Sequence, residues 1–303
     1  MGFRSRVRRG LEWGLTSLRI DRLARRRLSG RVLVVAYHNI VPRGERAAGE
    51  RALHLDQEMF GAQLDLLQAS HEVIPISRVG DLNHEQNRPR AVITWDDAYR
   101  GAVTAGVAEV TKRGLAATIF ACPGRLGGAA FWWDRWAAAA EGVLPAALRR
   151  RALEEWQGDE AVISREGGDM EVPSLPAHAH PATLDELRAA VDRPGITIGS
   201  HSWSHPNLTR VAGDRLEHEL ADSLAWLRER FPGQHVPWLS YPYGLNSPSV
   251  QAHAAAVGYQ GALVISGGWV PHQVDRYSLP RLNVSAGLSL QGFALRLAGL
   301  FCR

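Results

Sequence analysis

The strongest constraint on the fold of this chain is a series of short apolar runs that alternate with segments of helix-like spacing. The run RVLVVAY at residues 31–37 is typical of a strand buried on both faces, and residues 91–95, 116–121 and 196–199 form similar runs. Strands that alternate with helices predict a parallel sheet with right-handed crossovers. For a chain of 303 residues, this pattern favours an α/β fold in the form of a closed or nearly closed β/α barrel.

The predicted barrel domain extends over residues 31–285 and is interrupted at about residues 128–182. The interruption lacks the regular alternation and contains the segment FWWDRWAAAA. It is too short to form a core of its own, so we expect a helical insertion that packs on the barrel. We expect its tryptophans to be packing anchors rather than platforms for sugar rings: Trp132, Trp133 and Trp136.

Two sequence signals predict helices beyond the insertion. Thr183 and Glu186 form a capping box, which predicts that a helix begins there. Apolar residues at helix-like spacing in residues 286–303 predict a short C-terminal amphipathic helix.

The basic charge of the chain is concentrated at one end. Residues 1–31 contain ten arginines against Glu12 and Asp21, a net charge of +8, whereas the whole chain carries +4. Residues 1–30 therefore predict a basic amphipathic helix, whose apolar residues recur every three or four positions: Phe3, Val7, Leu11, Leu15 and Leu18. Residues 1–28 could contact an anionic membrane surface, or they could form a helix packed on its own domain with a solvated basic face.

The sequence also limits where in the cell the protein is expected and what it is expected to bind. There is no uncharged apolar run of 18 residues, and no apolar segment of the kind found in secretory signals comes after the basic start. Cys122 and Cys302 lie far apart, which suggests neither a disulfide framework nor a cysteine zinc site. We therefore expect a cytoplasmic protein, which the basic helix could attach to the inner face of the membrane. No nucleic acid partner is expected, because no aromatic-basic motif accompanies the arginines.

The first candidate for chemistry is the stretch AVITWDD at residues 91–97, where a predicted buried strand runs directly into Asp96 and Asp97. Functional residues of α/β folds gather at the carboxyl ends of strands. Taken alone, however, such a pair is also explained by a helix cap and a solvated carboxylate. The functional interpretation therefore requires other residues of the chain that could act together with this pair.

The partners are His201 and His205, which come after the predicted strand at 196–199. Two histidines four residues apart can turn their rings toward one point when the backbone is a helical turn. With Asp97 they supply one carboxylate and two imidazoles, a ligand set that Zn²⁺ or a similar divalent ion accepts. Such a metal lowers the pKa of a bound water toward about 7, and Asp96 could accept the proton. The sequence therefore predicts a metal-dependent hydrolase.

Three segments, TWDDAYRG, GSHSWSHPNL and SYPYG, resemble in this order the leading motifs of the polysaccharide deacetylase family, carbohydrate esterase family 4. The resemblance implies a distorted β/α barrel and metal-dependent removal of acyl groups, usually N-acetyl, from amino sugars. It implies that Asp96 is the general base and that Asp97, His201 and His205 hold the metal. It also implies that Tyr243 offers its backbone N–H to the oxyanion of the tetrahedral intermediate.

The chain departs from the family pattern at two places. The third motif usually begins with an arginine that orients the base, and Ser240 stands there. Arg281 in LPRLNV could substitute, with a structural role as the alternative. The late histidine that usually protonates the leaving amine has no match, so His38, at the end of the first predicted strand, is the first candidate and His272 the second. Beside an ionised Asp96, the pKa of His38 is expected to be raised. A hydrogen-bonded rim residue is the alternative for His38.

These observations together predict a deacetylase that uses a divalent metal, Zn²⁺ in the first instance. Its substrate is expected to be an N-acetylated amino sugar of a polysaccharide, glycolipid or lipid-linked precursor, contacted by Trp95, Tyr241 and Tyr243. One alternative is cleavage of an O-acetyl ester or an N-formyl group, because an ester needs less help from a general acid. The other is a non-catalytic glycan-binding or scaffold protein, against which Asp96 argues, since a binding module needs no base beside the metal.

Overall fold

The centre of the molecule is a sheet whose strands lie in the order β10-β1-β5-β6-β7-β8-β9, with β4 paired to β5. All of these pairs are parallel, which confirms the predicted α/β class. The computed structural model describes residues 10, 12–18, 20–80, 88–167, 173–271, 273 and 275–301. The strands are β1 (Val32–Tyr37), β4 (Glu72–Val73), β5 (Arg90–Trp95), β6 (Ala117–Ala121), β7 (Ile196–Ser200), β8 (His235–Ser240), β9 (Gly261–Leu263) and β10 (Leu282–Asn283).

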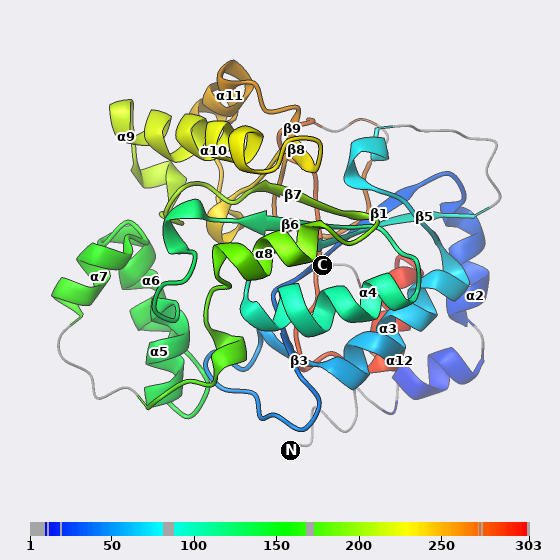
Figure 1. The fold of residues 1–303 in the computed structure, drawn as a ribbon. Coiled ribbons are helices and arrows are strands. Elements are labelled where there is room, and N and C mark those ends of the chain that lie inside the picture. Colours follow the sequence, from blue (N-terminus) through cyan, green and yellow to red (C-terminus); the bar gives the residue numbers. More distant parts are fainter. Residues whose placement is uncertain are drawn as a thin grey trace.

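The sheet curls into an incomplete barrel (Figure 1). The segment that precedes β10 bridges the opening between the two edge strands. The Leu279 N–H donates to the Ala262 carbonyl at 3.0 Å, and the Val264 N–H donates to the Leu279 carbonyl at 2.9 Å. The distorted β/α barrel expected from the sequence is therefore confirmed, and it is incomplete. In the segment that bridges its opening, residues 277–284, only the two residues of β10 form a regular strand.

Strands β1, β5 and β6 are buried on both faces, which explains their largely apolar sequence. In β1, Val32 and Val34 pack inside the barrel together with Phe120 and Trp238. The alternate residues of β1 face the surrounding helices: Leu33, Val35 and Tyr37. Successive side chains of a strand point to opposite faces, so every residue of these strands has a fixed side.

The helical layer includes α3 (Gln57–Ser70), α4 (Val107–Lys112), α8 (Leu184–Val191), α11 (Pro248–Val257) and α12 (Leu290–Leu297). After β7, three consecutive helical segments cover the barrel: α9 (Gly213–Glu217), the π-helical turn η7 (His218–Asp222) and α10 (Ser223–Arg230). A second π-helical turn, η3 (Ala102–Gly106), precedes α4.

The insertion consists of α5 (Trp132–Ala139), α6 (Ala146–Glu154), α7 (Glu160–Glu166) and the short turn η5 (Ala177–Ala179). In Figure 1, α5, α6 and α7 form a group at one side of the barrel. The capping box at its end is confirmed: the Glu186 N–H donates to Thr183 Oγ1 at 3.2 Å and the Thr183 N–H donates to Glu186 Oε2 at 2.8 Å. Helix α8 begins at this point, as expected.

The insertion is fastened to the barrel through Asp134, a fully buried carboxylate in α5. Its Oδ1 accepts from His54 Nε2 and from the Glu50 N–H, both at 2.8 Å. Its Oδ2 accepts from the Tyr99 hydroxyl at 2.6 Å. His54 belongs to β3 (His54–Asp56), which pairs with β2 (Asn39–Val41). A buried carboxylate is tolerated only when donors surround it, so this contact fixes the insertion against the barrel.

The two ends of the described chain lie together. A helix over residues 12–17 and α2 (Ile20–Arg25) precede the barrel, and the hydroxyl of Ser289 donates to Glu12 Oε2 at 2.6 Å. Trp13 and Leu18 are 65% and 75% exposed. Of the predicted apolar stripe, Leu15 is half-buried, whereas Phe3, Val7 and Leu11 lie outside the described residues, as does Cys302. Within the described residues, no helix is long and apolar enough to cross a membrane.

Candidate metal centre and active-site cavity

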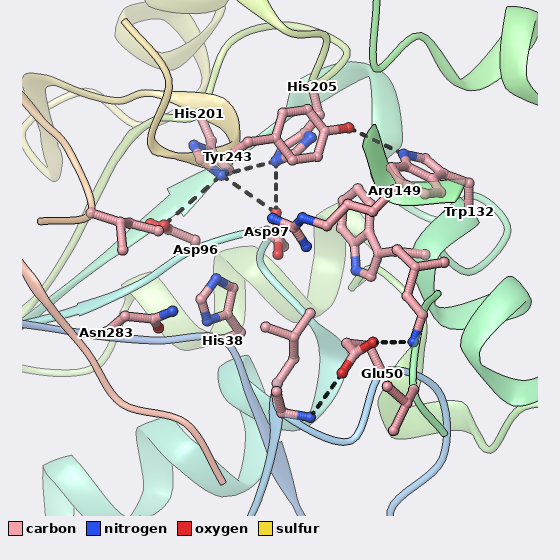
Figure 2. Close-up of a pocket in the computed structure, with 16 residues that line it drawn as sticks. His38, Glu50, Asp96, Asp97, Trp132, Arg149, His201, His205, Tyr243 and Asn283 are labelled. Carbon is pink, nitrogen blue, oxygen red and sulfur yellow. Dashed lines mark hydrogen bonds and ion pairs between the residues drawn. The ribbon is translucent and has the colours of Figure 1, made fainter. Parts of the chain in front are cut away.

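Residues at the carboxyl ends of three strands meet at one end of the barrel (Figure 2). Asp96 and Asp97 follow β5, His201 and His205 follow β7, and Tyr243 follows β8. Asp97, His201 and His205 are buried, and one ligand atom of each lies within 4.8 Å of the others. The three side chains therefore converge, as their residue types and strand-end positions predict.

The donor set fits a divalent cation. His201 Nδ1 lies 2.7 Å from the Ser240 carbonyl, which can only accept, so Nδ1 carries the proton and the neutral ring presents its lone pair at Nε2. This Nε2 lies 3.2 Å from His205 Nε2 and 3.4 Å from Asp97 Oδ1. His205 Nε2 lies 3.2 Å from the same oxygen. Asp97 Oδ1 is buried without a hydrogen-bond partner among the described residues. Lone pairs held this close repel one another unless a cation lies among them.

The pKa values of Asp97, His201 and His205 also indicate that the site favours positive charge. Burial raises the pKa of Asp97, but its contacts with His201 and His205 lower it far below its usual value. Burial lowers the pKa of His201, but the charges of Asp96 and Asp97 outweigh this effect and the net shift is upward. For His205, burial dominates and the pKa is lowered. The two carboxylates thus favour a cation or a proton at this place.

The backbone around the group is strained. Residues with positive φ angles cluster here: Asp97 (69°), Ala98 (49°), Ser202 (66°), His205 (67°) and Tyr243 (59°). Each such conformation of a non-glycine residue costs on the order of 1 to 3 kcal/mol and persists only where the surroundings enforce it. The expected helical turn between His201 and His205 is therefore wrong. The two rings approach through an irregular loop with two left-handed residues.

Buried polar groups hold this loop in place. Glu219, in the π-helical turn η7, accepts from the backbone N–H groups of Trp203 at 2.9 Å and Ser204 at 2.8 Å. The His205 N–H donates to Ser202 Oγ at 3.0 Å. Glu219 is 2% exposed and replaces the hydrogen bonds that a helix would have provided. The sequence contains no signal that identifies Glu219, because it acts from the next helix.

Arg281 contacts both oxygens of Asp96. Its Nη1 donates to Oδ1 at 2.8 Å and its Nη2 donates to Oδ2 at 2.7 Å, in the bidentate geometry that guanidinium and carboxylate groups favour. Nη2 also donates to the Ser240 hydroxyl at 2.8 Å. The small serine leaves room for a guanidinium that comes from the residue before β10 instead of from β8. The expectation that Arg281 reaches the base from another direction agrees with this geometry.

Asp96 is held in its ionised form. Burial alone would raise its pKa, but the charges of Arg281 and His201 bring the pKa down to about 2. The side chain is therefore able to accept a proton throughout the neutral pH range. It lies 4.0 Å from His201 Nε2, next to the candidate metal ligands but engaged mainly by Arg281.

His38 lies in the same cavity as the candidate metal ligands, as predicted (Figure 2). The expected rise in its pKa is wrong. Burial lowers the pKa more than Asp97 and Asp96 raise it, and the positive charges of Arg281 and His201 lower it further. The ring is therefore neutral at neutral pH. His272, the second candidate, lies outside the described residues.

Tyr243 is fixed by the insertion. Its hydroxyl accepts from Trp132 Nε1 at 3.1 Å and donates to the Gly158 carbonyl at 3.2 Å. Its ring centroid lies 4.5 Å from that of His205. Trp132 and Trp133 are almost fully buried, as expected of packing anchors, and they also line the cavity. The insertion thus supplies one wall of the site.

Trp95 and Tyr241 do not line the cavity, and the prediction that they contact a substrate is wrong. Trp95 is fully buried and packs against Phe60. Tyr241 is fully buried, and its hydroxyl donates to the Tyr277 carbonyl at 3.0 Å. Side chains alternate between the two faces of a strand, so the residue before Asp96 points away from the site.

The cavity has a volume of about 300 Å³ and contains three polar residues that the sequence did not indicate: Glu50, Arg149 and Asn283. Glu50 precedes β3 and accepts from the Leu144 N–H at 2.7 Å. Arg149 comes from α6 of the insertion, and Asn283 lies in β10 two residues after Arg281. The run of three arginines at 149–151 is visible in the sequence, but only the tertiary structure shows which one reaches the cavity.

Comparison with known proteins gives consistent results. A family model described as polysaccharide deacetylase matches residues 83–262. The protein YxkH of Bacillus subtilis (strain 168), named as a polysaccharide deacetylase, is 28% identical over 116 residues. That match covers 38% of this chain and 41% of the relative, so it spans less than half of the relative's length.

Solved structures of similar fold carry related names. The deacetylase PplD of Streptococcus pyogenes, solved in complex with acetate, has a TM-score of 0.62 at 15% identity and covers 88% of this chain and 98% of its own. A polysaccharide deacetylase from Bacillus cereus has a TM-score of 0.63 at 17% identity, with coverage of 88% and 69%. IcaB from Ammonifex degensii has a TM-score of 0.60 at 15% identity, with coverage of 88% and 97%. At these identities the likeness establishes the barrel fold.

The Asp96–Arg281 contact predicts a pH-dependent loss of stability in Arg281→Met. The variant leaves a buried carboxylate without its cation, which typically costs about 3 to 5 kcal/mol. In the native protein the pKa of Asp96 is lowered from 3.8 to about 2, so its stabilisation is complete above pH 4 and is lost as the pH falls toward 2. In the variant Asp96 can take up a proton in acid, so the difference in unfolding free energy should be largest at pH 7 and narrow toward pH 3.

Urea unfolding of both proteins at several pH values would measure this difference. Arg188→Met is a suitable control, because Arg188 pairs only with the exposed Asp185 on the surface of α8. That substitution should change stability by less than about 1 kcal/mol at any pH. A deficit for Arg281→Met that is independent of pH would show that Arg281 contributes packing rather than charge.

Proposed function

Because the chain belongs to the polysaccharide deacetylase family, which implies glycan deacetylation, we propose that it removes an N-acetyl group from an amino sugar with the help of a divalent cation. The substrate would be a polysaccharide, a glycolipid or a lipid-linked sugar precursor. The observation that carries this proposal is the convergence of Asp97, His201 and His205 beside an ionised Asp96. Zn²⁺ is the cation we propose, because one carboxylate and two imidazoles suit it well.

Each residue of the site then has a role. Asp97, His201 and His205 would hold the cation, which when bound polarises the acyl carbonyl and makes a nearby water easier to deprotonate. Asp96, ionised and oriented by Arg281, would take the proton of the attacking water. The backbone N–H of Tyr243, held in a left-handed conformation, would donate to the developing oxyanion.

The departing amine needs a proton, and we propose that His38 delivers it. His38 lines the cavity and belongs to no group of candidate metal ligands among the described residues. Its lowered pKa means that it enters the reaction neutral, so it would receive the proton that Asp96 has taken up and pass it on. An oxygen leaving group needs this proton less, so cleavage of an O-acetyl ester is one alternative reaction at the same site. Cleavage of an N-formyl group is another, although it also releases an amine.

One prediction of the proposed function concerns Asp96, the proposed general base. Asp96→Asn should retain the bound metal but lower kcat for acetate release by on the order of 10² to 10⁴, because only the proton acceptor is removed. Metal content by mass spectrometry and acetate release from a panel of N-acetylated amino sugars would be measured on the same preparations. His205→Ala is the matched comparison, since it should lose both metal and activity. Full turnover by metal-loaded Asp96→Asn would place the base elsewhere.

A second prediction separates the amide from the ester reaction. His38→Ala should lower turnover of an N-acetyl sugar about 10-fold more than that of its O-acetyl analogue, because amine departure depends more strongly on a proton. His253→Ala is a control, because His253 lies on the surface and contacts Glu217. Equal losses on both substrates would contradict the role proposed for His38.

The N-terminal helix favours a peripheral membrane contact, which we propose together with the cytoplasmic location expected from the sequence. Trp13 and Leu18 are exposed apolar residues within the arginine-rich segment. Trp13→Ser combined with Leu18→Ser should weaken binding to anionic vesicles at low salt and leave turnover of a soluble substrate unchanged. Sedimentation with anionic and zwitterionic vesicles would measure this. Binding that the two substitutions leave unaltered would contradict the contact.

A further inference from the structure

Arg149 is an exposed cation on the wall of the cavity, and it has no ion pair or hydrogen bond from its side chain within the described residues. In Figure 2 its side chain extends from the insertion toward Asp97, His201 and His205. Arg151, two residues further along the same helix, differs: it donates to Glu155 at 3.0 Å and stacks on Trp156. The insertion therefore directs the unpaired guanidinium of Arg149 at the site, whereas the charge of Arg151 is neutralised by Glu155.

The acidic groups of the cavity are already engaged by other partners. Both oxygens of Asp96 are bound by Arg281, and Asp97 faces the two histidines. The carboxylate of Glu50 accepts from the backbone N–H groups of Leu144 at 2.7 Å and Ala52 at 3.3 Å. The positive charge of Arg149 is thus available to a ligand.

A second hollow adjoins the cavity at Arg149. It has a volume of about 430 Å³ and extends over α6 and the loop after His205. Arg150 and Arg210 also line it, are exposed, and have no side-chain ion pair within the described part of the chain. Glu154 is the acidic residue of this lining. Three arginines against one carboxylate leave the hollow with an excess of positive charge.

Arg149 therefore lies on the border between the two hollows. Tyr243 and the candidate metal ligands line the same cavity as Arg149. A substrate whose reacting sugar occupies the cavity would pass Arg149 to bring its next unit into the second hollow.

We propose that the substrate is an acidic glycan. This inference rests on the deacetylase function proposed above and adds to it the charge of the substrate. The acylated sugar would bind in the cavity, and a carboxylate on the adjoining unit, or a phosphate linked to the acylated sugar itself, would bind to Arg149, with Arg150 and Arg210 contributing further charge. A guanidinium fork matches both anions bidentately, and this geometry makes Arg149 a specificity-determining residue.

The experiment compares three probes that carry N-acetylglucosamine. A chitin tetrasaccharide is neutral, a tetrasaccharide alternating with glucuronic acid carries carboxylates, and N-acetylglucosamine 1-phosphate carries a phosphate. The native enzyme should show a KM for at least one acidic probe about 10-fold below that for the neutral probe. Arg149→Gln combined with Arg210→Gln should abolish this preference, since a charge-assisted contact of this kind is worth about tenfold in affinity. The probe that gains the preference identifies the anion.

Arg151→Gln is the matched control, because it removes an arginine of the same helix that lines neither hollow. It should leave the preference intact. The preference should also fall with added salt in the native enzyme. Equal KM values for acidic and neutral probes, or a preference that survives the double substitution, would overturn the proposal. A loss of kcat on all three probes alike would overturn it too, because Arg149 would then act on the reaction rather than on substrate charge.

A binding measurement separates this inference from the deacetylase function. The dissociation constants of the same probes would be measured by calorimetry with Asp96→Asn, which lacks the proposed base. Tighter binding of an acidic probe that depends on Arg149 supports the inference even if the native protein releases no acetate. Turnover without any acidic preference in binding would leave the proposed reaction in place and overturn the inference.

Discussion

The barrel depends on one buried charge pair, Asp96 with Arg281. Both side chains are almost completely excluded from solvent, where an unpaired charge is too costly to retain. Arg281 satisfies its donors with acceptors from several strands: Thr94 Oγ1, both oxygens of Asp96, Ser240 Oγ and the Val264 carbonyl. The arginine precedes β10, in the segment that bridges the opening of the barrel. The contact that closes the barrel therefore also orients the proposed base.

The backbone of the site is strained, and the surrounding polar groups hold it in this conformation. Left-handed residues flank the carboxylate of Asp97 and the ring of His205, and regular secondary structure cannot stabilise them. Glu219 supplies hydrogen bonds to the loop of the histidines, and Trp132 together with Gly158 holds Tyr243 from the insertion. The rigid strands fix where the loops begin, and these polar contacts fix where the functional atoms lie. Because the contacts come from two different helical regions, a change in either region would alter the site.

The sequence predicted those features that depend on residue type and strand position. Asp97, His201 and His205 could be identified because ligand chemistry and the ends of parallel strands restrict where such residues meet. The errors arose where side-chain direction or tertiary packing decides. Trp95 was expected at the substrate, although the alternation along β5 already places it on the opposite face from Asp96. The pKa of His38 depends on burial and on Arg281, and neither is visible in a local pattern. Glu219 and Arg149 act across the fold, so no motif marks them.

The insertion and the barrel contribute different parts of the site. The barrel brings together the carboxylates, imidazoles and arginine to which the proposed hydrolysis assigns roles. The insertion adds the aromatic wall of Trp132 and Trp133 and the unpaired charge of Arg149. Asp134 fixes the aromatic wall through buried hydrogen bonds to β3 and to Tyr99, so the shape of this wall is held relative to the candidate metal ligands. Substrate choice therefore depends on a segment that can change without disturbing the chemistry, provided that the contacts of Asp134 and Tyr243 are retained.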